Sequence, residues 1–196
     1  MITLRPEEEK DYEKVFQVLS VKFKENPEFH IEEKNADFLL RSAIENDDIE
    51  LIKLLVKYHV LFTEDIFDFI GCSSEFVFFE IMNSIEINQP DFDWSNINTM
   101  LFDLAESSVA TSKMFLFAMS KKDTRLEILY KGDVPLLILL CMNNKFGILN
   151  DLLDNNFISK DSLNVLKYNN LTFLEYLDRY SPYNIYISFL RFFNLT

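Results

Sequence analysis

Residues 43–59 read AIENDDIELIKLLVKYH and decide the fold class of this 196-residue chain. Apolar Ala43 and Ile44 precede a polar run, Asn46-Asp47-Asp48, and apolar residues then recur from Ile49 to Val56 at the spacing of one helix face. The stretch therefore predicts the end of one helix, a tight turn and a second short helix. One such unit only packs, whereas several in series would form a binding surface.

The same pattern recurs farther along the chain. When the sequence is advanced by 97 residues, LCMNNKFGILNDLLDNN (residues 140–156) falls under the first stretch. Seven apolar positions coincide, Asn46 falls on Asn143, and Leu54 against Asp151 is the mismatch. Weaker copies occupy residues 70–82, 99–119 and 165–177, with predicted turns at Ser73-Ser74-Glu75, Ser107-Ser108 and Asn169-Asn170. The sequence thus predicts about five helix pairs with uneven spacing.

The two ends of the chain predict closing helices. Residues 6–25 are amphipathic, begin with Pro6 and a run of glutamates, and end before Asn26-Pro27. Residues 183–195 form a hydrophobic run of helical length. We therefore expect a single domain over residues 1–196, with an N-terminal helical cap (1–34), repeats (35–177) and a C-terminal capping helix (178–196).

AIENDDIELIKLL (residues 43–55) resembles the core of an ankyrin repeat, whose pattern is roughly A-A-x-x-G-H-x-E-I-V-K-L-L. Ala43 takes the place of the first alanine, and Asp47-Asp48 takes that of Gly-His. Residues 140–153 give the second match, and the other units match only in helix pairing and turn residues. No unit keeps the T-P-L-H opening, and the Gly of the family's hairpin is absent. The resemblance implies an all-α, ankyrin-like helical-repeat solenoid; another α-solenoid and an irregular helical bundle are the alternatives.

Charge and composition limit the classes of partner. The net charge of −13 repels nucleic-acid phosphates and anionic membranes. It either keeps a Phe-rich chain soluble or offers an acidic face to a cationic partner. There is no apolar signal region and no apolar run long enough to span a bilayer. Cys72 and Cys141 lie in apolar runs without metal-ligand spacing, which indicates reduced thiols in the core of a cytoplasmic protein.

Catalytic chemistry finds little support in the sequence. His30 and His59 are the two histidines, and His59 follows a helix end, where an imidazole interacts with the helix dipole. Asp47-Asp48 are better explained by turn and helix-capping chemistry than by acid–base catalysis. No HExxH, phosphate-binding loop or zinc spacing is present. We expect a non-enzyme without metal or cofactor, although a pocket joining a histidine to a cysteine or to paired carboxylates would favour an enzyme.

The segment NQPDFDWS (residues 88–95) is the most suggestive part of the predicted surface. It separates two predicted helix pairs, and it holds the single tryptophan of the chain, Trp94. The resemblance implies that loops between units project along one side and contact partners. The predicted partner-binding residues are therefore Asp91, Phe92, Asp93 and Trp94, together with Asp47 and Asp48. In the alternative interpretation, Trp94 folds back onto the next helix, with Ser95 as that helix's N-cap.

These observations predict a non-enzymatic, ankyrin-like protein–protein interaction module that binds another protein, and neither nucleic acid nor a membrane. Degenerate, Phe-rich stacks resemble those of viruses, intracellular bacteria and protists, so we expect a host-interaction factor in the cytoplasm or the host cell cytosol. The alternative is an acidic inhibitor of a basic partner, either a toxin immunity protein or a mimic of nucleic-acid charge. Acid concentrated on one face would support the inhibitor, and evenly spread acid would count against it.

Overall fold

The structure is a computed structural model that describes residues 12–26, 28–46, 48–121, 126, 129–160, 163 and 166–193. Backbone contacts divide the chain into two compact units, Met1–Asn96 and Ile97–Thr196, which are described separately. Helices dominate both units, so the predicted predominantly helical fold is confirmed. In the described ranges, no helix is long and apolar enough to cross a membrane. The division into one domain stays a prediction.

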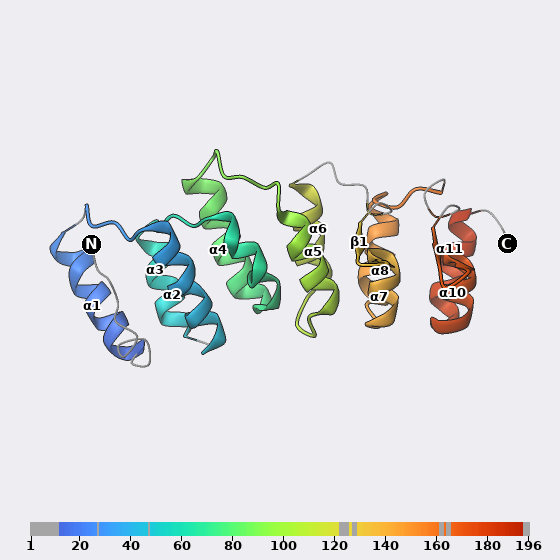
Figure 1. Cartoon of the computed structure of the whole chain (residues 1–196), viewed down its shortest axis with the longest axis horizontal. Coiled ribbons are helices and arrows are strands. Elements are labelled where there is room, and N and C mark those ends of the chain that lie inside the picture. The colour runs from blue at the N-terminus through green and yellow to red at the C-terminus, as the bar shows by residue number, and fades with distance from the viewer. Residues whose placement is uncertain are drawn as a thin grey trace. The chain divides into compact units, whose positions relative to one another are not determined.

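The first unit is built around a helix hairpin. Helix α2 (Glu33–Glu45) and helix α3 (Ile49–Lys57) contact each other across a short turn, and α1 (Tyr12–Glu25) and α4 (Glu75–Asn88) both pack on α3 (Figure 1). The connection from α3 to α4 contains two 3-10 segments, η1 (Glu64–Asp68) and η2 (Ile70–Cys72). Residues 6–11 of the predicted first helix lie outside the described residues.

Within its described residues, the second unit contains three helix hairpins that follow one another along the chain. The pairs are α5 (Ile97–Glu106) with α6 (Ser112–Ser120), α7 (Leu136–Met142) with α8 (Phe146–Asp154), and α10 (Phe173–Tyr180) with α11 (Tyr183–Phe193). The first helices contact in the order α5, α7, α10, and the second helices in the order α6, α8, α11 (Figure 1). Each pair therefore covers the apolar face of its neighbour within this unit.

Two short β-hairpins precede α7 and α10. Strand β1 (Tyr130–Lys131) pairs with β2 (Val134–Pro135), and β3 (Lys167–Tyr168) pairs with β4 (Leu171–Thr172) in the same register. In both copies, the first residue of the helix that follows the hairpin donates its N–H to the carbonyl of the residue that precedes the hairpin. Leu136 donates to Leu129 at 2.9 Å, and Phe173 donates to Leu166 at 3.2 Å. The two hairpins are thus the same structural unit repeated.

Of the two cysteines expected in the core, Cys141 is buried and Cys72 is exposed. The predicted core residues of the helices are buried. Those named from the apolar periodicity of the two best-matching stretches have at most 4% of their surface exposed: Leu51, Ile52, Leu55, Ile148, Leu149 and Leu152. Helix α7 is buried over residues 136–141 because it lies among α5, α8 and α10. A helix that is covered on all sides can be apolar all round, which explains the run LLILLC.

Asparagine ends three of the hairpin helices in the same way. Asn46, Asn143 and Asn155 each donate the side-chain amide to the carbonyl four residues earlier, at 2.7, 2.9 and 2.7 Å. Asn144 and Asn156, which follow two of these caps, have φ angles of 57° and 60°. The next N–H then bonds back to the last turn of the helix, as in a Schellman motif: Asp48 to Ala43, Lys145 to Leu140 and Phe157 to Leu152. The predicted equivalence of Asn46 and Asn143 is therefore confirmed.

The helix pair predicted over residues 165–177 is wrong. Asn169 and Asn170 do not join two helices but form the turn of the β3–β4 hairpin, with φ angles of 51° and 64°. Two positive φ angles suit a two-residue hairpin, and asparagine tolerates them better than most residues. Helix α10 begins only at Phe173, where Thr172 and Glu175 form a capping box. The expected closing helix, α11, is consequently the second helix of a pair.

Two further expectations about turns need correction. The residues before Ser73-Ser74 form the 3-10 segments η1 and η2 rather than the first helix of a pair. Phe69 (φ −143°) interrupts this stretch, and Gly71 in η2 is a poor helix former. The expected absence of a hairpin glycine was also wrong, because Gly132 lies in the β1–β2 turn with a φ of 61°.

Candidate protein-interaction site

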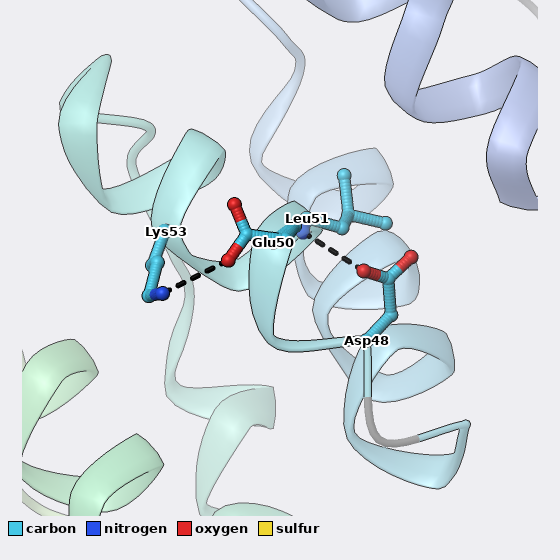
Figure 2. A network of polar contacts seen from close by, with 4 residues as sticks. All are labelled: Asp48, Glu50, Leu51 and Lys53. Carbon is cyan, nitrogen blue, oxygen red and sulfur yellow. Dashed lines mark hydrogen bonds and ion pairs between the residues drawn. The ribbon is translucent and has the colours of Figure 1, made fainter.

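Asp48, one of the predicted partner-binding residues, caps helix α3. Its Oδ1 atom accepts a hydrogen bond from the backbone N–H of Leu51 at 3.0 Å (Figure 2). On the same helix, the Nζ atom of Lys53 lies 2.9 Å from the Oε1 atom of Glu50, in an exposed ion pair. Asp47 lies outside the described residues. Capping accounts for Asp48, and a role in binding a partner stays a prediction.

The loop from Gln89 to Asn96 is anchored where it leaves α4. The side-chain amide of Gln89 makes two hydrogen bonds with the backbone of Phe62: Oε1 accepts from the N–H, and Nε2 donates to the carbonyl, both at 2.8 Å. Phe92 donates its N–H to the Gln89 carbonyl at 3.0 Å. Farther along, the Oδ1 atom of Asp93 accepts from the N–H of Ser95 at 2.8 Å. These bonds give the loop a defined shape.

The two aromatic residues of this loop lie on a buried ring. Phe92 and Trp94 are half-buried, and their ring centroids lie 5.7 Å and 5.8 Å from that of Phe67, which is fully buried in η1. Their own rings meet edge to face at 5.1 Å. Asp91 and Asp93, between and beside them, are exposed. The structure therefore brings four of the predicted residues together as a half-exposed aromatic pair flanked by carboxylates.

Asp37 holds the segment that carries Phe67, and sequence reasoning missed it. This residue of α2 is only 6% exposed, and its carboxylate accepts the Thr63 N–H at 3.2 Å and the Thr63 hydroxyl. Thr63 is also the N-cap of η1, since its hydroxyl oxygen accepts from the N–H of Asp65. The only sequence signal was an aspartate beside Ala36 on the apolar side of a helix. Its partner lies 26 residues away.

The pKa of Asp37 is raised from 3.8 to about 6. Burial is the largest cause, because it disfavours the charged form. The two hydrogen bonds from Thr63 act in the opposite direction, and the nearby carboxylates of Asp65 and Glu33 raise the pKa further. Asp37 is thus a titratable anchor between α2 and η1.

Both histidines line one hollow of the first unit. Its volume is about 420 Å³, and its walls include His30, His59 and the carboxylate residues Glu32 and Glu33. That combination is the one that would favour an enzyme. However, in the described part of the chain no hydrogen bond joins either imidazole to a carboxylate, and no three His, Cys, Asp or Glu side chains group as metal ligands. His59 has a φ of 50° at the end of α3, which is a helix-terminating position.

The net negative charge of the chain arises in its first half. Residues 1–96 contain 22 acidic and 9 basic residues, whereas residues 97–196 contain 10 of each. No lysine or arginine occurs between Lys57 and Lys113, a stretch that has ten aspartates and glutamates. The candidate loop lies inside this stretch. The net charge of −13 is therefore a local property of one unit and not an even coating of the molecule.

Comparison with protein-family models gives no match to this chain, and comparisons with curated proteins and with solved structures give none either.

Proposed function

We propose that the chain is a non-enzymatic, ankyrin-like protein-interaction module whose partner binds at the loop of residues 88–95. The observation that carries the proposal is the half-exposed pair Phe92 and Trp94 on the buried Phe67, with exposed Asp91 and Asp93 beside them. Aromatic side chains offer a large contact area at a small entropic cost, which makes them frequent energetic centres of interfaces. The proposed location is the cytoplasm, including the cytosol of a host cell.

The ankyrin-like part of the proposal rests on repeated local structure. In the second unit, each of two hairpins with identical register is followed by a helix hairpin, and the two copies begin 37 residues apart, at Tyr130 and Lys167. The first unit contributes a helix hairpin, α2–α3, with the same asparagine cap and turn as α7–α8. Repeats of this kind bury their apolar faces against one another and leave loops for recognition.

The acidic inhibitor is the second candidate, because the charge is concentrated. An excess of acid confined to residues 1–96 supports a basic partner more strongly than an even coating would. Under this hypothesis the partner is a cationic toxin or a nucleic-acid-binding protein whose nucleic-acid surface is covered. The interaction module and the acidic inhibitor would use the same site. They differ in how much of the binding free energy is electrostatic.

An affinity capture from a cell lysate at low and at high salt tests both. The bait is the full chain, compared with Phe92→Ala/Trp94→Ala and with a surface control, Ile87→Ala, whose side chain is 78% exposed. A partner that is lost with the double variant and kept with the control supports the loop as the site. Capture that survives high salt indicates a largely apolar interface, and salt-sensitive capture of a basic protein favours the inhibitor.

Each bait is checked by its melting temperature, because Phe92 and Trp94 also pack on Phe67. We expect the double variant to remain folded with a lower melting temperature. If it unfolds, or if it captures the partner as well as the unmodified chain does, the loop is a packing element and not a binding site.

A further inference from the structure

We propose that the surface around Phe92 and Trp94 binds a cationic segment of the partner, and that the arginine side chains of this segment make the contacts. The inference rests on the proposed function and specifies the chemistry of the partner at the same loop. We call the surface the acidic aromatic patch. It comprises the half-exposed rings of Phe92 and Trp94, which lie on the buried ring of Phe67, and the exposed residues Glu64, Asp65, Asp68, Asp91 and Asp93.

Two segments far apart in sequence build the patch. The contacts of Phe67 with Phe92 and Trp94 place η1 against the loop, so exposed acidic residues of both segments adjoin one aromatic centre in the sequence of each segment. The hydrogen bonds of Asp37 to Thr63 and of Gln89 to Phe62 fix the start of each segment. A surface held in this way loses little conformational entropy when a partner binds.

The carboxylates of the patch form no ion pairs in the described part of the chain, although the guanidinium of Arg41 lies over the ring of Phe69, which follows Asp68 in the sequence. The stretch from residue 58 to residue 112 supplies no lysine or arginine to neutralise them. Like charges that crowd one surface attract a counter-charge over roughly a Debye length, about 8–10 Å at physiological salt. Charge complementarity therefore favours a basic occupant and disfavours phosphate groups and anionic lipid.

The aromatic rings favour arginine over lysine. A guanidinium group is planar and weakly hydrated, so it can stack on a ring while it donates two parallel hydrogen bonds to a carboxylate. An ammonium group is strongly hydrated and acts as a point charge. Next to η1, the guanidinium carbon of Arg41 lies 4.8 Å from the ring centroid of Phe69, and lysine ammonium groups also lie over rings of this chain, as Lys121 does over Phe117 at 4.5 Å. A half-exposed tryptophan is the best ring for this contact.

The single tryptophan makes a direct test possible, because its fluorescence reports from inside the patch. Three synthetic peptides serve as probes on the full chain: four arginines spaced by glycine and serine, and the same peptide with lysine or with uncharged citrulline in place of arginine. We expect the arginine peptide to change Trp94 emission with an affinity at least about threefold higher than that of the lysine peptide. The citrulline peptide should not bind.

Charge-neutral variants locate the binding. Asp91→Asn/Asp93→Asn should weaken the arginine peptide about tenfold, and so should Glu64→Gln/Asp68→Asn, which leaves the bond from Ser95 to Asp93 intact. The matched control is Asp154→Asn/Asp178→Asn, which removes the same charge from exposed positions in the second unit. The control should change the affinity less than twofold. The melting temperature of each variant shows that it is folded.

Two results would overturn the inference: equal affinity for the arginine and lysine peptides, or equal weakening by the control pair and the patch pairs. Either result would mean that only net charge attracts the peptides.

Failure of the proposed function is detected by a different combination of results. If Phe92→Ala/Trp94→Ala abolishes capture of the partner while the arginine peptide does not bind, the inference fails and the proposed function stands. If the peptide binds at the patch while capture is unaffected, the proposed function fails.

Discussion

Asn144 tests the way in which a single residue ends a helix. It has a φ of 57°, a conformation that costs about 1–2 kcal/mol for a residue with an ordinary Cβ and nothing for glycine. We expect Asn144→Ala to lower the free energy of unfolding by about 1 kcal/mol and Asn144→Gly to leave it unchanged or to raise it slightly. Urea denaturation followed by circular dichroism measures both. Equal stability of the two variants would argue against the left-handed cap.

Asp37 makes the stability of the first unit depend on pH. Its folded-state pKa of about 6 exceeds the ordinary value of 3.8, so the folded chain binds this proton more tightly than the unfolded chain. Protonated Asp37 therefore adds its full contribution to the free energy of unfolding below about pH 4, and this contribution is lost as the pH rises through 6. We expect Asp37→Asn, which cannot ionise, to lack this pH-dependent component.

Melting temperatures of the unmodified chain and of Asp37→Asn, recorded from pH 4 to pH 7, give the comparison. As the pH rises from 4 to 7, the unmodified chain should lose stability relative to Asp37→Asn. The loss should correspond to roughly 1–3 kcal/mol in the free energy of unfolding. Thr63→Val, which removes the hydroxyl but keeps the carboxyl, is the matched control and should retain a pH dependence of the same sign. Parallel curves for the unmodified chain and Asp37→Asn would show that Asp37 is ionised in the fold.

At the scale of the helix, Leu55 on α3 and Leu152 on α8 should matter equally although they lie in different units. Both are fully buried, and each helix packs on several neighbours. Truncation to Ala should lower the free energy of unfolding by about 2–5 kcal/mol at each position, through lost transfer energy and a cavity. Leu54→Ala, at a half-buried position of α3, should cost clearly less. A cost below about 1 kcal/mol at Leu55 would contradict the packing described for α3.

Helices and their ends were predictable because their signals are local. Apolar periodicity identified the buried faces of α3 and α8, and the alignment of Asn46 with Asn143 identified equivalent caps. Asn169-Asn170 was misassigned because one dipeptide suits both a helix-ending turn and a hairpin, since each needs positive φ. The pair Thr172 and Glu175, spaced as a capping box, was the local signal that could have placed the helix start correctly.

The candidate site was only half predictable. The aromatic and acidic character of residues 91–94 is written in the sequence, and that was enough to single out the loop. What positions the loop is not local. Gln89 binds the backbone of Phe62, and Asp37 binds Thr63, across separations of 27 and 26 residues. No sequence periodicity or motif predicts hydrogen bonds between residues so far apart in the chain. The contact of Phe67 with Trp94 is therefore known only from the structure.

At the scale of the whole chain, the two units should respond differently to salt. The first has a large excess of acid and the second is balanced, so screening relieves repulsion in one and little in the other. Hydrogen exchange of the amides in α3 and α7, measured at low salt and at 0.5 M sodium chloride, compares the units within one molecule. Protection should rise in α3 by the equivalent of about 0.5–1 kcal/mol and stay nearly constant in α7. An equal change in both would contradict the asymmetry.

The asparagine caps also bear on how such a chain can diverge. All glycine codons begin with two guanines, whereas asparagine is encoded by AAT and AAC, so a gene that drifts toward adenine and thymine loses glycine and gains asparagine. Helix ends that need a positive φ can survive this drift, because asparagine tolerates the left-handed conformation best after glycine. The turns at Asn144 and Asn156 have the required backbone without the glycine by which a pattern search would find them. Mutational bias can thus remove the glycine that identifies a turn in the sequence while the backbone conformation of the turn is kept.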